Sequence, residues 1–215
     1  MVSHFATLAM VFLFISHVPG QTTDAQTSDS DDTAGKQWAF TLSAFGYLIP
    51  NDQSYGSPTF TADHQWLHLE ARYNYEAQQT GSLWVGYNLR VGDKLVLEAT
   101  PILGAVFGNM TGIAPGCELN ISYQKVALSS QIEYVFDTSN SSNSFLYSWN
   151  ELVYSPTNWF HAGLVSQRTR AYHTSLNVER GFSVGLAHKS VDFTTYIFNA
   201  GWTDPTVVLA LSFKF

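Results

Sequence analysis

The sequence has one cysteine and few charged residues, and each shortage excludes a class of protein. Cys117 has no second cysteine to pair with, so the chain forms neither an intramolecular disulfide nor a cysteine-based metal site. Charged residues make up 13% of the chain, against about 25% in soluble globular domains. Aromatic residues reach 15%. This composition is too poor in charge for the surface of an ordinary soluble domain.

Positive charge is especially scarce. The chain has 10 Lys and Arg residues against 17 Asp and Glu residues, which gives a formal net charge of −7. Binding to nucleic acid depends on neutralising phosphates with Lys and Arg, and no basic run occurs in the sequence. We therefore expect no nucleic-acid partner.

The chain also lacks an apolar run long enough for a membrane-spanning helix, which needs about 20 residues. The apolar stretch at Phe5–Ile15 is shorter and suits a secretory signal peptide, although no Lys or Arg precedes it. We expect a signal peptide at residues 1–20, cleaved near Gly20. Residues 21–36 are polar and acidic without an apolar period, which predicts a disordered leader.

From residue 37 onward the hydrophobic pattern has a period of two, which predicts β-strands. In residues 67–76 (LHLEARYNYE), apolar and tyrosine side chains alternate with His, Glu, Arg and Asn. Residues 83–91 and 94–108 alternate in the same way. No segment shows a helical apolar stripe over three turns. The sequence therefore predicts an all-β domain over residues 37–215.

The number and spacing of the strands point to a barrel. About twelve strands of roughly ten residues, the length of a tilted membrane-spanning strand, are found if the weaker segment Ser57–Gln65 is included; ten strands are the alternative. Twelve strands place both termini of the domain and all short turns at one end, as in an antiparallel up-and-down transmembrane β-barrel. Short turns are expected near His64, Gly92–Asp93, Lys125, Pro156–Thr157 and Ser190.

The apolar faces of these strands can meet either a protein core or lipid. They continue for about ten residues, and aromatic residues gather at the strand ends, as they do at membrane interfaces. Backbone polar groups in hydrocarbon must all be paired, which requires a closed barrel. We therefore expect lipid outside the barrel. The aromatic residues expected at the interfaces are Trp38, Tyr47, Trp66, Tyr75, Phe107, Tyr134, Phe136, Trp159, Phe213 and Phe215.

The chain ends in TVVLALSFKF, with apolar residues at every second position up to a terminal Phe. Val207, Leu209, Leu211, Phe213 and Phe215 share one strand face. This ending resembles the C-terminal signature of bacterial outer-membrane β-barrel proteins. The resemblance implies residence in the outer membrane, contact with its lipids, and insertion by the barrel assembly machinery that reads this signature.

The polar strand faces would then line the lumen. Glu70, Asn88 and Glu98 are expected near one level, with arginines diagonal to them. Such a set either braces the barrel with ion pairs or forms a charged constriction that selects small solutes. We expect a porin-like channel for the passive passage of small solutes. The expected lumen-lining residues are Glu70, Arg72, Asn88, Arg90, Glu98 and Glu133.

A lipid-modifying enzyme is one alternative. Outer-membrane phospholipase and lipid A deacylase resemble each other in using a His-x-Ser pair on the barrel surface, where a spacing of two puts both side chains on one strand face. This chain contains His173–Ser175 and His188–Ser190, but neither serine is followed by the Asn that accompanies it in that family. We therefore assign no catalytic residue. No cluster has metal-ligand spacing, and no metal or cofactor is expected.

Two other interpretations stay open. A structural barrel that displays its loops to partners would show the same strand pattern, because a fold does not fix a function. Asn109, Asn120 and Asn140 begin glycosylation sequons, which would matter only in a protein secreted by a eukaryote.

Overall fold

Nearly all regular structure in the described part of the chain is β-strand. The computed structural model describes residues 37–49, 53–171, 177–201 and 205–215, so the expected signal peptide and leader lie outside the described residues. No helix among the described residues is long and apolar enough to cross a membrane; the short 3-10 helix η1 spans Ser141–Asn143. The strands are β1 (Ala39–Leu48), β2 (Tyr55–His64), β3 (Leu67–Tyr73), β4 (Thr80–Tyr87), β5 (Leu89–Val91), β6 (Leu95–Gly108), β7 (Gly112–Tyr123), β8 (Val126–Asp137), β9 (Phe145–Tyr154), β10 (Phe160–Ala171), β11 (Asn177–His188), β12 (Val191–Phe198) and β13 (Thr206–Lys214).

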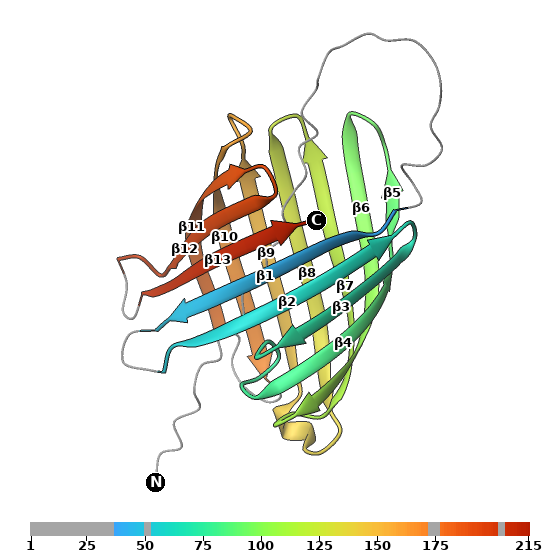
Figure 1. Cartoon of the computed structure of the whole chain (residues 1–215). Helices are drawn as coiled ribbons and strands as arrows, with labels where there is room; N and C mark the ends of the chain where they lie inside the picture. The colour runs from blue at the N-terminus through green and yellow to red at the C-terminus, as the bar shows by residue number, and fades with distance from the viewer. Residues whose placement is uncertain (1–36, 50–52, 172–176, 202–204) are drawn as a thin grey trace.

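The strands form one antiparallel sheet that closes on itself (Figure 1). β1 pairs with both β2 and β13, and β4 pairs with β6, so that twelve strands complete the ring while β5 pairs with β6 alone. The prediction of twelve strands is confirmed, and the alternative of ten is wrong. The weak segment at Ser57–Gln65 belongs to β2, which spans Tyr55–His64.

The short strand β5 continues the pairing of β4. Gly86 lies opposite Ile102 and Leu89 lies opposite Ala99, so the register against β6 is the same on both sides of the break. Pro101 lies opposite the break and has no N–H to donate to the ladder. The single strand expected at residues 83–91 is therefore interrupted by a proline on its partner strand.

Connections differ between the two ends of the barrel. At one end, β2–β3, β7–β8 and β11–β12 are joined by two-residue turns whose first residues, Gln65, Gln124 and Lys189, have φ between 52° and 54°. We call this the short-turn end, and residues 37 and 215 lie at it. Longer connections, including 74–79 and 138–144, lie at the opposite end, the long-loop end. The short turns expected from the sequence lie at one end, but residues 109–111 at the long-loop end form only a three-residue connection between β6 and β7.

Side chains alternate between the interior and the outer wall. On β13, Val208, Ala210 and Ser212 are buried, whereas Leu209 and Leu211 are exposed. The same alternation around the ring leaves an outer wall of exposed Leu, Val, Ile and Phe side chains. The apolar stripe of the last strand therefore faces outward.

The seam between β1 and β13 holds the end of the chain in place. Phe40 N–H donates to the Phe215 carbonyl at 2.9 Å, and Phe215 N–H donates to the Phe40 carbonyl at 3.0 Å. Their rings stack with centroids 5.6 Å apart. Inside the same seam, Ser43 Oγ and Ser212 Oγ share a hydrogen bond of 2.8 Å. Residue 215 is thus part of the closure of the ring.

Two of the expected interfacial aromatics point inward. Tyr47 and Tyr75 are each 1% exposed, so their expected place on the outer wall is wrong. Tyr47 follows Ser43 and Phe45 on the inward face of β1. Tyr75 lies beyond the end of β3, where Asn74 adopts a φ of 54° and ends the alternation. Of the others, Tyr134 is partly buried on the outward face, and those exposed are Trp38, Trp66, Phe107, Phe136, Trp159, Phe213 and Phe215.

Candidate functional site

Aromatic side chains fill the barrel interior toward the long-loop end. Trp149 makes edge contacts with Tyr196 and Phe198, at centroid separations of 5.4 and 5.5 Å. These side chains belong to one buried cluster that spans several strands. We call the aromatic members that are less than 2% exposed the aromatic layer: Tyr47, Tyr75, Tyr147, Trp149, Tyr196 and Phe198.

A charged cluster adjoins the aromatic layer and is centred on Arg72 of β3. The Arg72 guanidinium lies over the rings of Tyr75 and Trp84, 4.3 and 4.2 Å from their centroids. Four buried carboxylates surround it, so one positive charge faces four acidic groups. Their shortest distances to a guanidinium nitrogen are 2.5 Å for Glu70, 3.0 Å for Glu133, 3.6 Å for Glu118 and 3.8 Å for Glu76.

Glu76 links this charged cluster to β4. It lies in the loop after β3, and its Oε1 accepts a hydrogen bond of 2.6 Å from Ser82 Oγ. Trp84 Nε1 donates in turn to Ser82 Oγ at 2.9 Å. Burial raises the pKa of the Glu76 carboxyl, although the Arg72 charge acts in the opposite direction. The loop end of β3 is thus tied to the interior by polar contacts.

The six residues expected in the lumen fall into separate groups. Glu70, Arg72 and Glu133 meet in the charged cluster. Arg90 and Glu98 form an ion pair at the short-turn end, where both side chains are exposed to solvent; we call them the rim pair. Asn120 Nδ2 donates to Glu98 Oε2 at 3.0 Å.

Asn88 lies between the two groups. Its Nδ2 donates to Asp63 Oδ1, and its Oδ1 accepts from Thr100 Oγ1, both at 2.8 Å. The expected common level of Glu70, Asn88 and Glu98 is wrong, because the ladder sets Glu70 opposite Trp84. The loop 74–79, whose fold the alternation of residues does not reveal, fixes this register.

A polar cavity of about 440 Å³ occupies the interior toward the short-turn end. It runs from the charged cluster to the rim pair. Four carboxylates and two cationic side chains, Arg90 and Lys214, are among its lining residues. The carboxylates belong to Asp63, Glu70, Glu98 and Glu118.

Four residues of this site are not among the six lumen-lining residues expected from the sequence: Asp63, His68, Glu76 and Glu118. Glu118 lies on β7, which is separated from β3 in the ring by β4 and β6. No local signal marks it, because its approach to Glu70 and Arg72 comes from the curvature of the ring. Asp63 is the penultimate residue of β2 and faces His68 across the ladder.

A second polar group lies on another part of the inner wall. Glu151 accepts hydrogen bonds from Ser183 Oγ at 2.7 Å and from Tyr196 at 3.3 Å. His161 shares a hydrogen bond of 3.0 Å with Thr194, and its Nδ1 lies 3.7 Å from Asp192. Both ring nitrogens of His161 therefore have polar neighbours.

The His-x-Ser pairs gain no support as an active site. His173 and Ser175 lie outside the described residues. His188 and Ser190 flank a turn at Lys189, whose φ of 54° ends β11, and both are exposed at the short-turn end. They do not share a strand face, which the proposed proton transfer requires.

Comparison with known proteins identifies structures of the same architecture. No protein-family model matches the sequence, and no curated protein is significantly similar to it. Among solved structures, the KdgM porin matches with a TM-score of 0.57 at 8% identity, over 81% of this chain and 99% of that chain. The KdgM porin in complex with disordered oligogalacturonate gives a TM-score of 0.58 at 8% identity, with the same coverage. The Acinetobacter baumannii outer membrane protein Omp33 gives 0.50 at 13% identity, over 84% of this chain and 100% of that chain. The chain therefore has the closed β-barrel fold of bacterial outer-membrane porins.

Proposed function

We propose that the protein resides in a bacterial outer membrane and acts as a porin-like channel for the passive passage of small solutes. The observation that carries this proposal is the polar cavity of about 440 Å³ inside a closed barrel with an apolar outer wall. A barrel of twelve strands is wide enough for an aqueous path when its inward side chains leave room. The porin fold of the neighbouring structures supports the same function.

The charge of the cavity supports a proposal about the solutes. The KdgM porin was solved with oligogalacturonate, an acidic sugar chain. Here four carboxylates line the cavity against two cationic side chains, Arg90 and Lys214. We propose that this lumen favours neutral or cationic solutes and disfavours acidic ones. We also propose that the outward stripe from Val207 to Phe215 is read by the barrel assembly machinery during insertion.

Conductance in planar lipid bilayers tests the channel. The refolded protein should insert and give discrete current steps, and a KCl gradient should produce a reversal potential of the sign that cation selectivity requires. Stable insertion without any conductance would contradict the channel and leave a structural or loop-displaying barrel. Selectivity for chloride would contradict the proposed role of the carboxylates.

Contact between the outer wall and lipid can be tested by placing an arginine on the wall at two depths, one in the middle of a strand and one at its end. Leu164 lies in the middle of β10 and is 66% exposed. Leu164→Arg should lower the free energy of unfolding in lipid vesicles by about 2–4 kcal/mol, because the guanidinium would lie near the bilayer midplane. Leu95→Arg, at a residue 58% exposed at the start of β6, should cost about 0–1 kcal/mol. Equal losses at the two depths would contradict a membrane around the barrel.

A further inference from the structure

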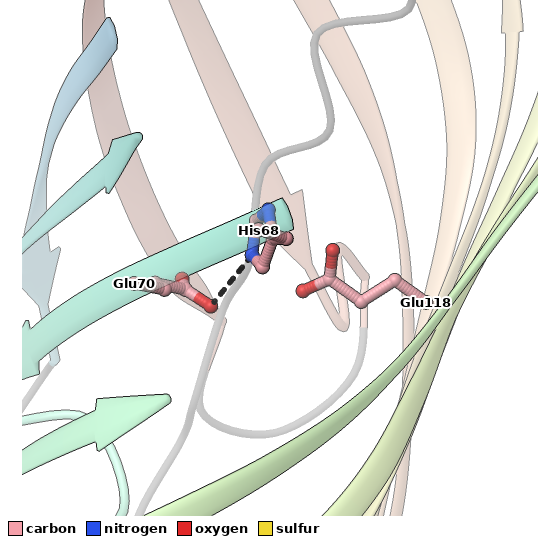
Figure 2. Close-up of side chains that lie close together, drawn as sticks. All are labelled: His68, Glu70 and Glu118. Atoms are coloured by element: carbon pink, nitrogen blue, oxygen red, sulfur yellow. Dashed lines mark ion pairs between the residues drawn. The ribbon is translucent and has the colours of Figure 1, made fainter. Parts of the chain in front are cut away.

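Three side chains that can bind metal ions meet at the inner end of the cavity (Figure 2). β3 supplies His68 and Glu70, and β7 supplies Glu118. One ligand atom of each lies within 4.8 Å of the ligand atoms of the other two. In Figure 2 both carboxylates point toward the imidazole. All three side chains are buried, yet they line a cavity through which an ion can reach them.

The imidazole of His68 is held with one nitrogen directed into this group. Its Nδ1 lies 2.8 Å from Asp63 Oδ1. A carboxylate only accepts hydrogen bonds, so Nδ1 keeps its proton and Nε2 is the nitrogen that can offer a lone pair to a metal ion. Nε2 is buried and has no hydrogen-bond partner among the described residues. Metal-binding histidines usually donate a hydrogen bond from the ring nitrogen that does not bind the metal, often to a carboxylate.

The distances fit an ion between these groups better than a proton. His68 Nε2 lies 3.8 Å from Glu70 Oε2, too far for a hydrogen bond, which needs about 2.7–3.2 Å. Two ligands of a tetrahedral zinc ion, each about 2.1 Å from the metal, lie roughly 3.4 Å apart. The ligand atoms lie within 4.8 Å of one another, so relative movements of up to about 1.4 Å bring the group to that spacing.

The local charge also favours a cation. Arg72 contributes one positive charge to the charged cluster, in which Glu70 and Glu118 are two of four carboxylates. Buried carboxylates require balancing charge. A divalent ion held by His68, Glu70 and Glu118 would supply it beside Arg72.

We infer that His68, Glu70 and Glu118 form a binding site for a divalent transition-metal ion of the zinc class. The imidazole nitrogen sets this class, because hard ions such as Ca²⁺ and Mg²⁺ take oxygen ligands. Asp63 is a positioning residue that holds the His68 tautomer. The ion would also join β3 to β7 across the lumen. This inference does not depend on the channel function, since binding requires only the folded barrel.

Calorimetric titration of Zn²⁺ into the full chain, refolded in detergent micelles, tests the site. The wild type should bind one Zn²⁺ in a step that His68→Ala and Glu118→Gln abolish. Asp63→Asn keeps the shape of the side chain but not its charge, and should weaken binding about 10–100-fold. His161→Ala is the matched control. It removes another histidine of the inner wall, whose two nitrogens already have polar neighbours, and it should leave the affinity unchanged.

The outcomes separate the site from nonspecific binding. Absence of Zn²⁺ binding by the wild type would overturn the inference, as would binding that survives both His68→Ala and Glu118→Gln. Ca²⁺ should not compete with Zn²⁺, and displacement of Zn²⁺ by Ca²⁺ would contradict the proposed metal class. Circular dichroism of each variant confirms that it has folded. If His68→Ala fails to fold, Glu118→Gln and Asp63→Asn still decide the question.

Discussion

Arg72→Met should destabilise the barrel by about 3–5 kcal/mol, because removing one partner of a buried ion pair leaves charge without compensation. The guanidinium of Arg72 lies within 4.0 Å of all four carboxylates of the charged cluster and over two aromatic rings. Methionine fills part of the space but carries neither the charge nor the donors. Urea unfolding of the protein in lipid vesicles, followed by tryptophan fluorescence, measures the change.

Arg90→Met provides the matched control. It removes the same type of side chain from the rim pair, where both partners are exposed to solvent. Exposed ion pairs contribute about 0–1 kcal/mol, so this variant should stay close to the wild type. Similar stability of the two variants would show that Arg72 is not the centre of a buried network.

Opening the aromatic layer should raise the single-channel conductance severalfold. Tyr147 and Trp149 are fully buried inside the barrel, and Trp149 contacts two further aromatic rings. The double variant Tyr147→Ala/Trp149→Ala removes two large side chains from the interior toward the long-loop end. Replacing such residues also costs stability, about 3–5 kcal/mol for a buried Trp. Single-channel recording reports only on barrels that have folded and inserted, so it measures the path itself.

Phe182→Ala separates this effect from a general loss of packing. Phe182 is an aromatic residue on the outward face of β11, so its removal leaves the interior unchanged. The single-channel conductance of the Phe182→Ala variant should equal that of the wild type. A double variant that inserts normally but conducts no better than wild type would show that the aromatic layer does not limit the flow.

The fold could be predicted from the sequence because its main signals are local. The period of two, the alternating loop lengths and the outward stripe of β13 each depend on neighbouring residues. Even the weak strand β2 could be predicted. Without it the number of strands would be odd, and the last strand would run in the wrong direction to end beside the start of the first. The error at Tyr75 arose at a strand end, where Asn74 with a positive φ changes the side on which the next residue lies. Tyr47 follows the regular alternation of β1 and lies inward with Ser43 and Phe45, so its aromatic character alone did not reveal its side.

The site could be predicted only in part. Glu70, Arg72 and Glu133 were found because each lies on the polar face of a strand whose other face is apolar. The pairing of Arg72 with Glu133 could not be predicted, since the two residues are 61 positions apart. Glu118 could not be predicted either, because the curvature of the ring brings it to this cluster. The level of Asn88 was wrong because a six-residue loop sets the register of β4. Long-range geometry of this kind leaves no trace in the spacing of residues.

The seam between β1 and β13 has a consequence for the timing of assembly. Ser43 and Ser212, which meet in the seam, are 169 positions apart. A polypeptide delivered from its N-terminus therefore carries β1 with one unpaired edge until the final segment arrives. Contacts this distant in sequence form slowly, and an unpaired strand edge invites adhesion to other chains. Prematurely terminated products would keep that edge permanently, and only the finished polypeptide can remove it.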